Sequence, residues 1–185
     1  MKIKMSVLFV VFFGFSACNP KMDSETYAHF HSKGNDVATL AQSTLLANVG
    51  GAIQKGGPEY AVEFCNLNAS GIIDSLNRVN NCAISRVSEK NRNPQNNLKT
   101  KTEEILWNTF QNHALKDTVL KAGDNFVYYK RINTALPACL LCHGNTETDI
   151  NQATRKKLNE LYPEDLATGY KLNEFRGLWK VEFKK

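Results

Sequence analysis

The chain has 185 residues, enough for one domain, and its 42% apolar and 22% charged residues are typical of a globular protein with a core. Its formal net charge of +5 is spread along the sequence and forms no Lys/Arg-rich block, so we expect no nucleic-acid partner. After residue 18, no apolar run is long enough to cross a membrane.

The N-terminal residues 1–17 are typical of a bacterial signal peptide, with two lysines before an apolar stretch that is too short to span a bilayer. The sequence Phe15-Ser16-Ala17-Cys18 resembles a lipoprotein box, in which cleavage before the cysteine leaves a thiol that carries lipid. Plain secretion with cleavage after Ala17 is the alternative. We expect a lipid anchor on Cys18 and a periplasm-facing protein of the bacterial cell envelope. Asn19 favours the outer over the inner membrane.

A polar tether is predicted for residues 18–35, between the lipid and a domain that spans residues 36–185. Two helices follow, at 36–55 and 58–76, because apolar residues recur there at steps of three and four. A Gly-Gly-Pro sequence separates them. Cys65 lies on the apolar stripe of the second helix, either as a small buried residue or as a ligand to iron.

Alternating side chains predict three strands, at residues 81–88, 126–132 and 177–183. Thr100 and Glu103 match a capping box that begins a further helix after the first strand. Residues 150–161 predict a helix before the last strand, and two further strands can lie in the loops. This order of elements predicts an α+β fold.

The sequence Cys139-Leu140-Leu141-Cys142-His143 matches Cys-x-x-Cys-His, the attachment motif of a c-type haem. Two thiols three positions apart reach the two vinyl groups, and the next histidine then lies under the iron. A structural zinc site needs a second pair of ligands, which the sequence lacks. A redox dithiol needs a strand-to-helix context that the preceding residues do not indicate. We predict one covalent haem c on Cys139 and Cys142, with His143 as an axial ligand.

Further side chains are candidates for the walls of a haem pocket. The strand 126–132 directly precedes the motif, so we expect it to line the pocket. An arginine fork matches a propionate carboxylate, and a tyrosine can pack on the ring edge. An ordinary surface position for the arginines and core packing for the tyrosines explain them equally well. The candidates are Arg92, Arg131, Tyr128, Tyr162 and Tyr170.

Five cysteines, less the lipidated one and the thioether pair, leave Cys65 and Cys82. They either form a disulfide, which an oxidising compartment allows, or have separate roles.

Several stretches resemble a family of single-haem c-type proteins with a PAS-like domain, long catalogued as a domain of unknown function and regarded as candidate haem sensors. The motifs that carry the resemblance cover most of residues 37–185 and are Ala61-Val62-Glu63-Phe64-Cys65, Arg86-Val87-Ser88, Arg92-Asn93-Pro94-Gln95-Asn96, Cys139-Leu140-Leu141-Cys142-His143-Gly144, Tyr162-Pro163-Glu164-Asp165-Leu166-Ala167-Thr168-Gly169-Tyr170 and Arg176-Gly177. The resemblance implies a PAS-like antiparallel sheet with flanking helices. It also implies Cys65 as the sixth ligand of the iron, and it matches Cys82 to no motif. The chain departs from the family pattern at 98–100 and 173–175.

A thiolate favours ferric iron, so a pair of His143 and Cys65 predicts a low reduction potential and a ligand that can leave on reduction. We therefore expect a redox or small-ligand sensor, with a lipid-anchored electron-transfer cytochrome as the alternative. A six-coordinate haem without a spare distal acid–base pair argues against an enzyme such as a peroxidase. The expected partners are the membrane, through the lipid, and a redox protein.

Overall fold

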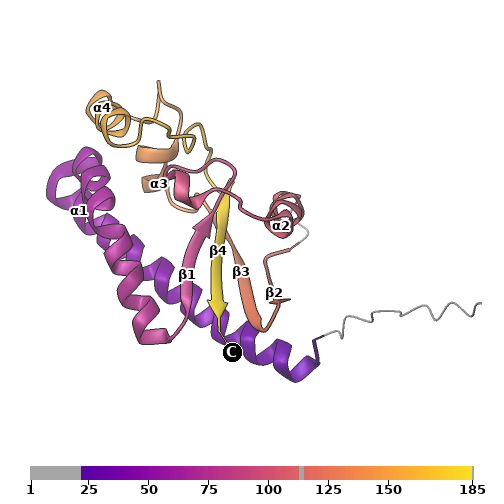
Figure 1. Cartoon of the computed structure of the whole chain (residues 1–185). Coiled ribbons are helices and arrows are strands. Elements are labelled where there is room, and N and C mark those ends of the chain that lie inside the picture. The colour runs from indigo at the N-terminus through magenta and orange to yellow at the C-terminus, as the bar shows by residue number, and fades with distance from the viewer. Residues whose placement is uncertain (1–21, 113–114, 185) are drawn as a thin grey trace, which may run out of the picture.

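The structure is a computed structural model that describes residues 22–112 and 115–184. The predicted signal peptide, 1–17, and the predicted lipid attachment site, Cys18, lie outside the described residues. In chain order the elements are α1 (Ser24–Asn80), β1 (Ala83–Val87), the short 3-10 helix η1 (Pro94–Asn96), α2 (Lys101–Gln111), β2 (Asp117–Ala122), β3 (Asn125–Asn133), α3 (Pro137–His143), α4 (Gln152–Leu161) and β4 (Phe175–Phe183). Figure 1 shows one sheet with α1 against one of its faces and with α3 and α4 beyond one end of the strands.

The first helix begins earlier than the sequence predicts, at Ser24 instead of residue 36. The side chain of Asp23 caps it by accepting a hydrogen bond of 2.8 Å from the amide of Thr26. The early part of the helix packs on the sheet, because the Phe30 ring stacks on Phe126 with 4.1 Å between centroids. Residues 24–35, which were predicted to be a tether, therefore belong to the folded domain.

The Gly-Gly-Pro sequence breaks α1 where it was predicted to separate two helices. Gly56 and Gly57 leave helical geometry, and Gly57 has a φ of 78°, in the left-handed region that favours glycine. We call residues 24–55 the first arm of α1 and residues 58–80 the second arm. The chain reverses at the break, so that the second arm leads back to β1 (Figure 1).

The four strands form one antiparallel sheet in the order β1-β4-β3-β2. The three predicted strands are confirmed as β1, β3 and β4, and β2 is one of the further strands expected in the loops. A two-residue turn at Gly123-Asp124 joins β2 to β3, and Gly123 has a φ of 61°. The α+β class with an antiparallel sheet and flanking helices is therefore confirmed, and it is consistent with a PAS-like fold.

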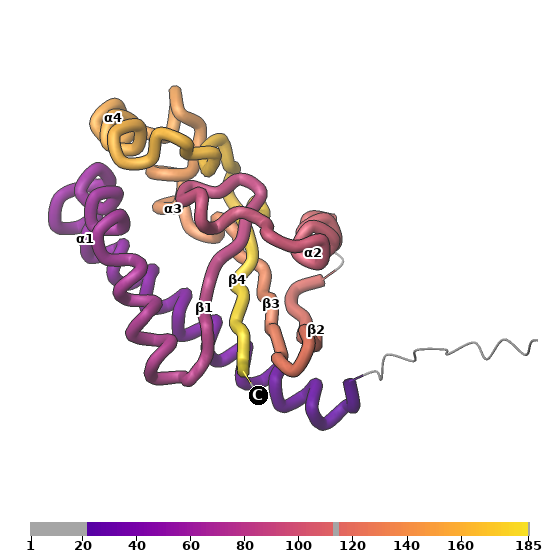
Figure 2. Tube along the Cα trace, in the orientation of Figure 1, coloured from indigo at the N-terminus to yellow at the C-terminus, as the bar shows by residue number. Residues whose placement is uncertain are grey.

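Alternate side chains of each strand point to opposite faces of the sheet, and helices cover both faces. On one face, Trp179, Val181 and Phe183 pack under the first arm of α1, as predicted for the last strand. On the other face, Leu178 packs with Leu106 and Phe110 of α2. The tube in Figure 2 shows α3, α4 and their loops beyond the end where β1 finishes and β4 begins. In the part of the chain that the structure describes, no helix is both long enough and apolar enough to cross a bilayer.

Candidate functional site

The Cys-x-x-Cys-His sequence forms the short helix α3. Pro137 occupies its first turn, where a missing N–H costs nothing, and the amide of Gly144 bonds to the Leu140 carbonyl at 2.9 Å to end it. Three positions along a helix is close to one turn, so Cys139 and Cys142 lie on the same side. Both are half-buried free thiols. This is the spacing that the prediction of two thioether bonds requires.

His143 is oriented by a hydrogen bond on one side of its ring. Its Nδ1 lies 2.7 Å from the carbonyl oxygen of Ala167, and because a carbonyl only accepts, Nδ1 carries the proton. Nε2 then keeps its lone pair, as in metal-binding histidines whose other nitrogen is held by a carbonyl. Burial holds the pKa of His143 well below its usual range, and the charges of Arg92, Arg176 and Arg86 lower it further. The imidazole is therefore neutral, and its orientation is fixed with Nε2 unprotonated.

The loop after α4 holds His143 in place through its backbone as well. The amide of Tyr170 donates to the His143 carbonyl at 2.9 Å, and the amide of Gly169 donates to the Gly144 carbonyl at 2.7 Å. Gly169 has a φ of 77°, so the turn favours glycine there. The ring of Tyr170 meets the His143 ring edge to face, with 6.4 Å between centroids. Tyr170 thus lies at the site, as predicted.

Arg92 joins the motif to the same loop. Its Nη2 donates to the Cys142 carbonyl at 2.5 Å, and its Nε donates to the Asp165 carboxylate at 3.0 Å. The ion pair is largely buried, with 14% and 9% of the two side chains exposed. Arg92 therefore lies beside the motif, where Asp165 compensates its charge and two of its three nitrogens hold Asp165 and the Cys142 carbonyl.

Cys65 lies near the motif, on the second arm of α1. It lies close enough to raise the pKa of Cys142 slightly, and Arg86 and Arg92 act on the Cys65 thiol in turn. Burial raises the pKa of the Cys65 thiol, and the two arginines counteract this increase. Burial also raises the pKa of Cys142, to about 11. Cys65 therefore adds a third thiol close to the two of the motif, from a different element.

Cys82 is remote from Cys65. At a rise of about 1.5 Å per residue, the second arm separates the two cysteines by roughly 20 Å, well beyond the reach of a disulfide. Both are free thiols, and Cys82 packs against the core between α1 and the sheet. Of the two alternatives left open by the sequence, the structure shows separate positions and no disulfide between them.

Two predicted pocket residues lie elsewhere. Tyr128 is fully buried under the first arm of α1, against Gly34, and Arg131 lies on the opposite side of the sheet. The Nη1 of Arg131 donates to the Phe110 carbonyl, and its guanidinium covers the Phe175 ring at 4.5 Å. The expectation that strand 126–132 lines the pocket through Tyr128 and Arg131 is therefore wrong, because Tyr128 packs in the core under the first arm of α1 and Arg131 lies against Phe110 and Phe175.

Tyr162, by contrast, lies at the site as predicted. It packs with Cys142 in a small apolar cluster, and the guanidinium of Arg92 lies 5.8 Å from its ring centroid. This cluster joins α3 and α4 to Val62 of the second arm.

Two arginines that were given no role also face the site. Arg86 projects from β1 and Arg176 from the start of β4, and both lower the pKa of His143. The Nη1 of Arg176 donates to the Ser88 hydroxyl at 3.1 Å and to the Lys90 carbonyl at 2.9 Å. Both residues stand inside the motifs that carry the family resemblance, which is the signal that marked them in the sequence.

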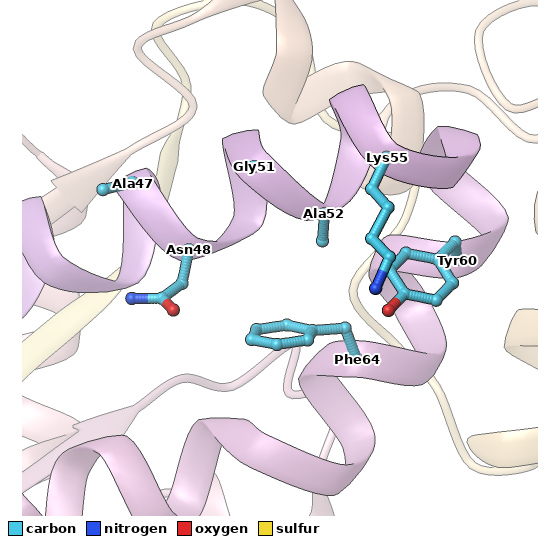
Figure 3. Close-up of a pocket in the computed structure, with 7 residues that line it drawn as sticks. All are labelled: Ala47, Asn48, Gly51, Ala52, Lys55, Tyr60 and Phe64. Atoms are coloured by element: carbon cyan, nitrogen blue, oxygen red, sulfur yellow. The ribbon is translucent and has the colours of Figure 1, made fainter.

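An open groove of about 420 Å3 lies between the two arms of α1. Figure 3 shows Phe64 projecting from the second arm towards the first, with Lys55 and Tyr60 at the other end. The groove is lined by Ala47, Asn48, Gly51, Ala52, Lys55, Tyr60 and Phe64. Phe64, which directly precedes Cys65, is thus the lining residue nearest in sequence to this thiol.

The residues at the site fit a covalent haem. They supply two thiols on one side of a helical turn, a neutral imidazole with a directed Nε2, and a further thiol nearby. They also supply cationic side chains, one of which, Arg176, has a buried Nε without a hydrogen-bond partner in the described residues. A haem carries the complementary groups, namely two vinyls, an iron and two carboxylates.

The fold and the site define an α+β protein in which a Cys-x-x-Cys-His helix lies beyond one end of an antiparallel sheet. A sequence model of the Tll0287-like family, described as Tll0287, matches residues 19–183, and the chain belongs to this family. A solved structure, described as the crystal structure of the cyanobacterial heme-protein Tll0287, is similar with a TM-score of 0.62 and 22% identity. The match covers 83% of this chain and 96% of that chain, and it shows the shared fold. No curated protein matches the chain.

Proposed function

We propose that the protein binds one haem c covalently through Cys139 and Cys142, with His143 and Cys65 as the axial ligands of its iron. The observation that carries the proposal is the orientation of His143, whose Nδ1 is held by the Ala167 carbonyl so that Nε2 is free. The description of the related Tll0287 structure as a heme-protein supports the same cofactor. The haem supplies a redox-active iron, and a thiolate ligand favours its ferric state.

The protein's own residues then have distinct roles. Ala167 fixes the tautomer of His143, and Arg92 holds the carbonyl of Cys142 against Asp165. Cys65 comes from a different element, the second arm of α1, which is joined to the first arm through the break at Gly56-Gly57. We therefore infer that Cys65 would be the holding residue that can change its position, while His143 stays fixed by Ala167.

A redox or small-ligand sensor agrees best with this division. The proposed ligand thiol comes from a different element than His143, next to an open groove of about 420 Å3 between the two arms of α1, so the two ligands are held independently. A lipid-anchored electron-transfer cytochrome is the alternative, and it requires instead that both axial ligands stay in place in both oxidation states. A low midpoint potential with ligand exchange on reduction favours the sensor, and rapid exchange without ligand change favours the carrier. We assign no catalysed reaction to the site.

The proposal includes export and a lipid on Cys18, for which the motif at residues 15–18 is the support. Labelled palmitate that enters the wild type and is absent from Cys18→Ser would agree with it. Equal labelling of the two proteins would contradict it.

The ligand role of Cys65 is tested by optical and electron paramagnetic resonance spectra of the ferric holoprotein. Cys65→Ala should lose the low-spin thiolate spectrum. Cys82→Ala is a matched change at a free thiol just beyond the end of the second arm, and it should leave the spectrum intact. An unchanged spectrum in Cys65→Ala would remove this residue from the iron.

A further inference from the structure

Two arginines at the site have no acidic partner. In residues 22–112 and 115–184, neither Arg86 nor Arg176 takes part in a salt bridge, whereas Arg92 is paired with Asp165. The Arg86 guanidinium stacks on the Trp179 ring at 5.8 Å, and that of Arg176 stacks on Tyr170 at 5.3 Å. Among the described residues, Asp165 lies close enough to act on the charge of Arg176 but is paired with Arg92, so the site holds two arginines without a salt-bridge partner of their own.

Such charges are costly when they are removed from water. An arginine side chain stays protonated in proteins, and a buried charge without a counter-ion destabilises the folded state. Burial lowers the pKa of both guanidinium groups, which shows that each is partly desolvated. A bound anion at this place would remove the cost.

The geometry of Arg176 indicates what kind of anion fits. Its Nη1 is committed to Ser88 and Lys90, so Nε and Nη2 remain on the other edge of the fork. Nε is buried and makes no hydrogen bond within the described residues. A carboxylate can accept from both of these nitrogens at once.

We propose that Arg86 and Arg176 each bind one propionate of the haem. This inference rests on the proposed haem binding. It differs from the prediction that Arg92 and Arg131 take this role. Charge balance supports it: ferric porphyrin carries one positive charge, which the Cys65 thiolate cancels, and the two propionates then match the two arginines. Arg92 and Asp165 form a neutral pair beside them.

Resonance Raman spectroscopy of the holoprotein tests the assignment, because the propionate bending modes report on hydrogen bonds to the carboxylates. Arg86→Gln and Arg176→Gln should each shift one propionate mode, and the double variant should shift both. Arg86→Lys and Arg176→Lys should restore the charge without the fork and give intermediate shifts. Arg155→Gln, whose partner is the exposed Glu147, is the matched control and should shift neither.

The reduction potential provides a second readout. With its arginine present, a propionate stays ionised and should add no pH dependence to the potential between about pH 5 and pH 7. In the double variant, a desolvated propionate without a cation has a raised pKa, and the potential should fall more steeply than in the wild type as pH rises through that range. Proton uptake by a released Cys65 thiol contributes equally to both proteins, so the difference between them is the readout. If the double variant does not accumulate, each single glutamine variant is compared with the wild type in the same way.

The outcomes separate this inference from the proposed function. A wild type without haem would overturn both. Haem-loaded wild type whose propionate modes are unchanged in both glutamine variants would overturn the inference alone. So would a change confined to the iron–sulfur mode in Arg86→Gln, because Arg86 would then serve the thiolate of Cys65.

Discussion

Replacing Arg92 with methionine should destabilise the protein more than any comparable loss of a surface charge. Methionine keeps much of the apolar stem but removes the guanidinium, so Asp165 stays largely buried with only the Ala167 amide, at 2.8 Å, among its described partners. Removing one partner of a buried ion pair costs about 3–5 kcal/mol. The lost hydrogen bond to the Cys142 carbonyl would by itself account for about 1.5–3 kcal/mol, the amount that a hydrogen bond to a charged group contributes.

Equilibrium urea unfolding, followed by far-ultraviolet circular dichroism, measures the effect on the free energy of unfolding. Arg155→Met is the matched control, because it removes the same group from a pair whose acidic partner, Glu147, is exposed. It should cost less than about 1 kcal/mol. In Arg92→Met/Asp165→Leu the stranded carboxylate is gone, so this double variant should be more stable than Arg92→Met.

The reasoning would be refuted if Arg92→Met lost no more stability than Arg155→Met. It would also fail if the stability lost by the double variant equalled the sum of the losses measured for Arg92→Met and for Asp165→Leu alone. Either result would mean that the pair between Arg92 and Asp165 contributes nothing beyond its separate side chains.

Three further predictions concern the scaffold. Glu103→Gln should cost about 2 kcal/mol in the same urea assay, because one amide nitrogen must face the Lys99 amide or the Lys180 ammonium that now donate to the carboxylate. Burial alone raises the pKa of Glu103, but these hydrogen bonds outweigh it and hold the pKa below its usual value. The ionised carboxylate therefore contributes its full stabilisation above about pH 4.3, and this stabilisation is lost as pH falls through the lower pKa of the folded state. Glu103→Gln should lack this loss in an acid titration. Gly34→Ala should lower the melting temperature, because a Cβ there lies 2.3 Å from Tyr128 Cγ, while Gly50→Ala, with nothing within 4 Å, should raise it.

Patterns local to one element predicted much of the fold. The two-residue alternation located β1, β3 and β4, and Thr100 caps α2 as expected, with the Glu103 amide donating to its hydroxyl at 3.2 Å. The Gly-Gly-Pro sequence marked the break in α1. Each of these signals acts through neighbours in sequence, so a single chain displays it.

Contacts between distant elements could not be read in the same way. Residues 24–35 form a helix because Phe30 and Gly34 meet the sheet, which their polar neighbours do not reveal. Tyr128 precedes the motif by only eleven residues. A strand extends about 3.3 Å per residue, however, so the rest of β3 carries the chain well away from Tyr128 before the motif begins. Arg86 and Arg176 lie together only because β1 pairs with β4.

The haem attachment itself is tested most directly by the intact mass and the peptide map of the protein purified from a host that is competent in cytochrome maturation. The account predicts a mass increase equal to one haem, located on the peptide that contains Cys139, Cys142 and His143. Unmodified protein in which both motif cysteines react with an alkylating agent would contradict it.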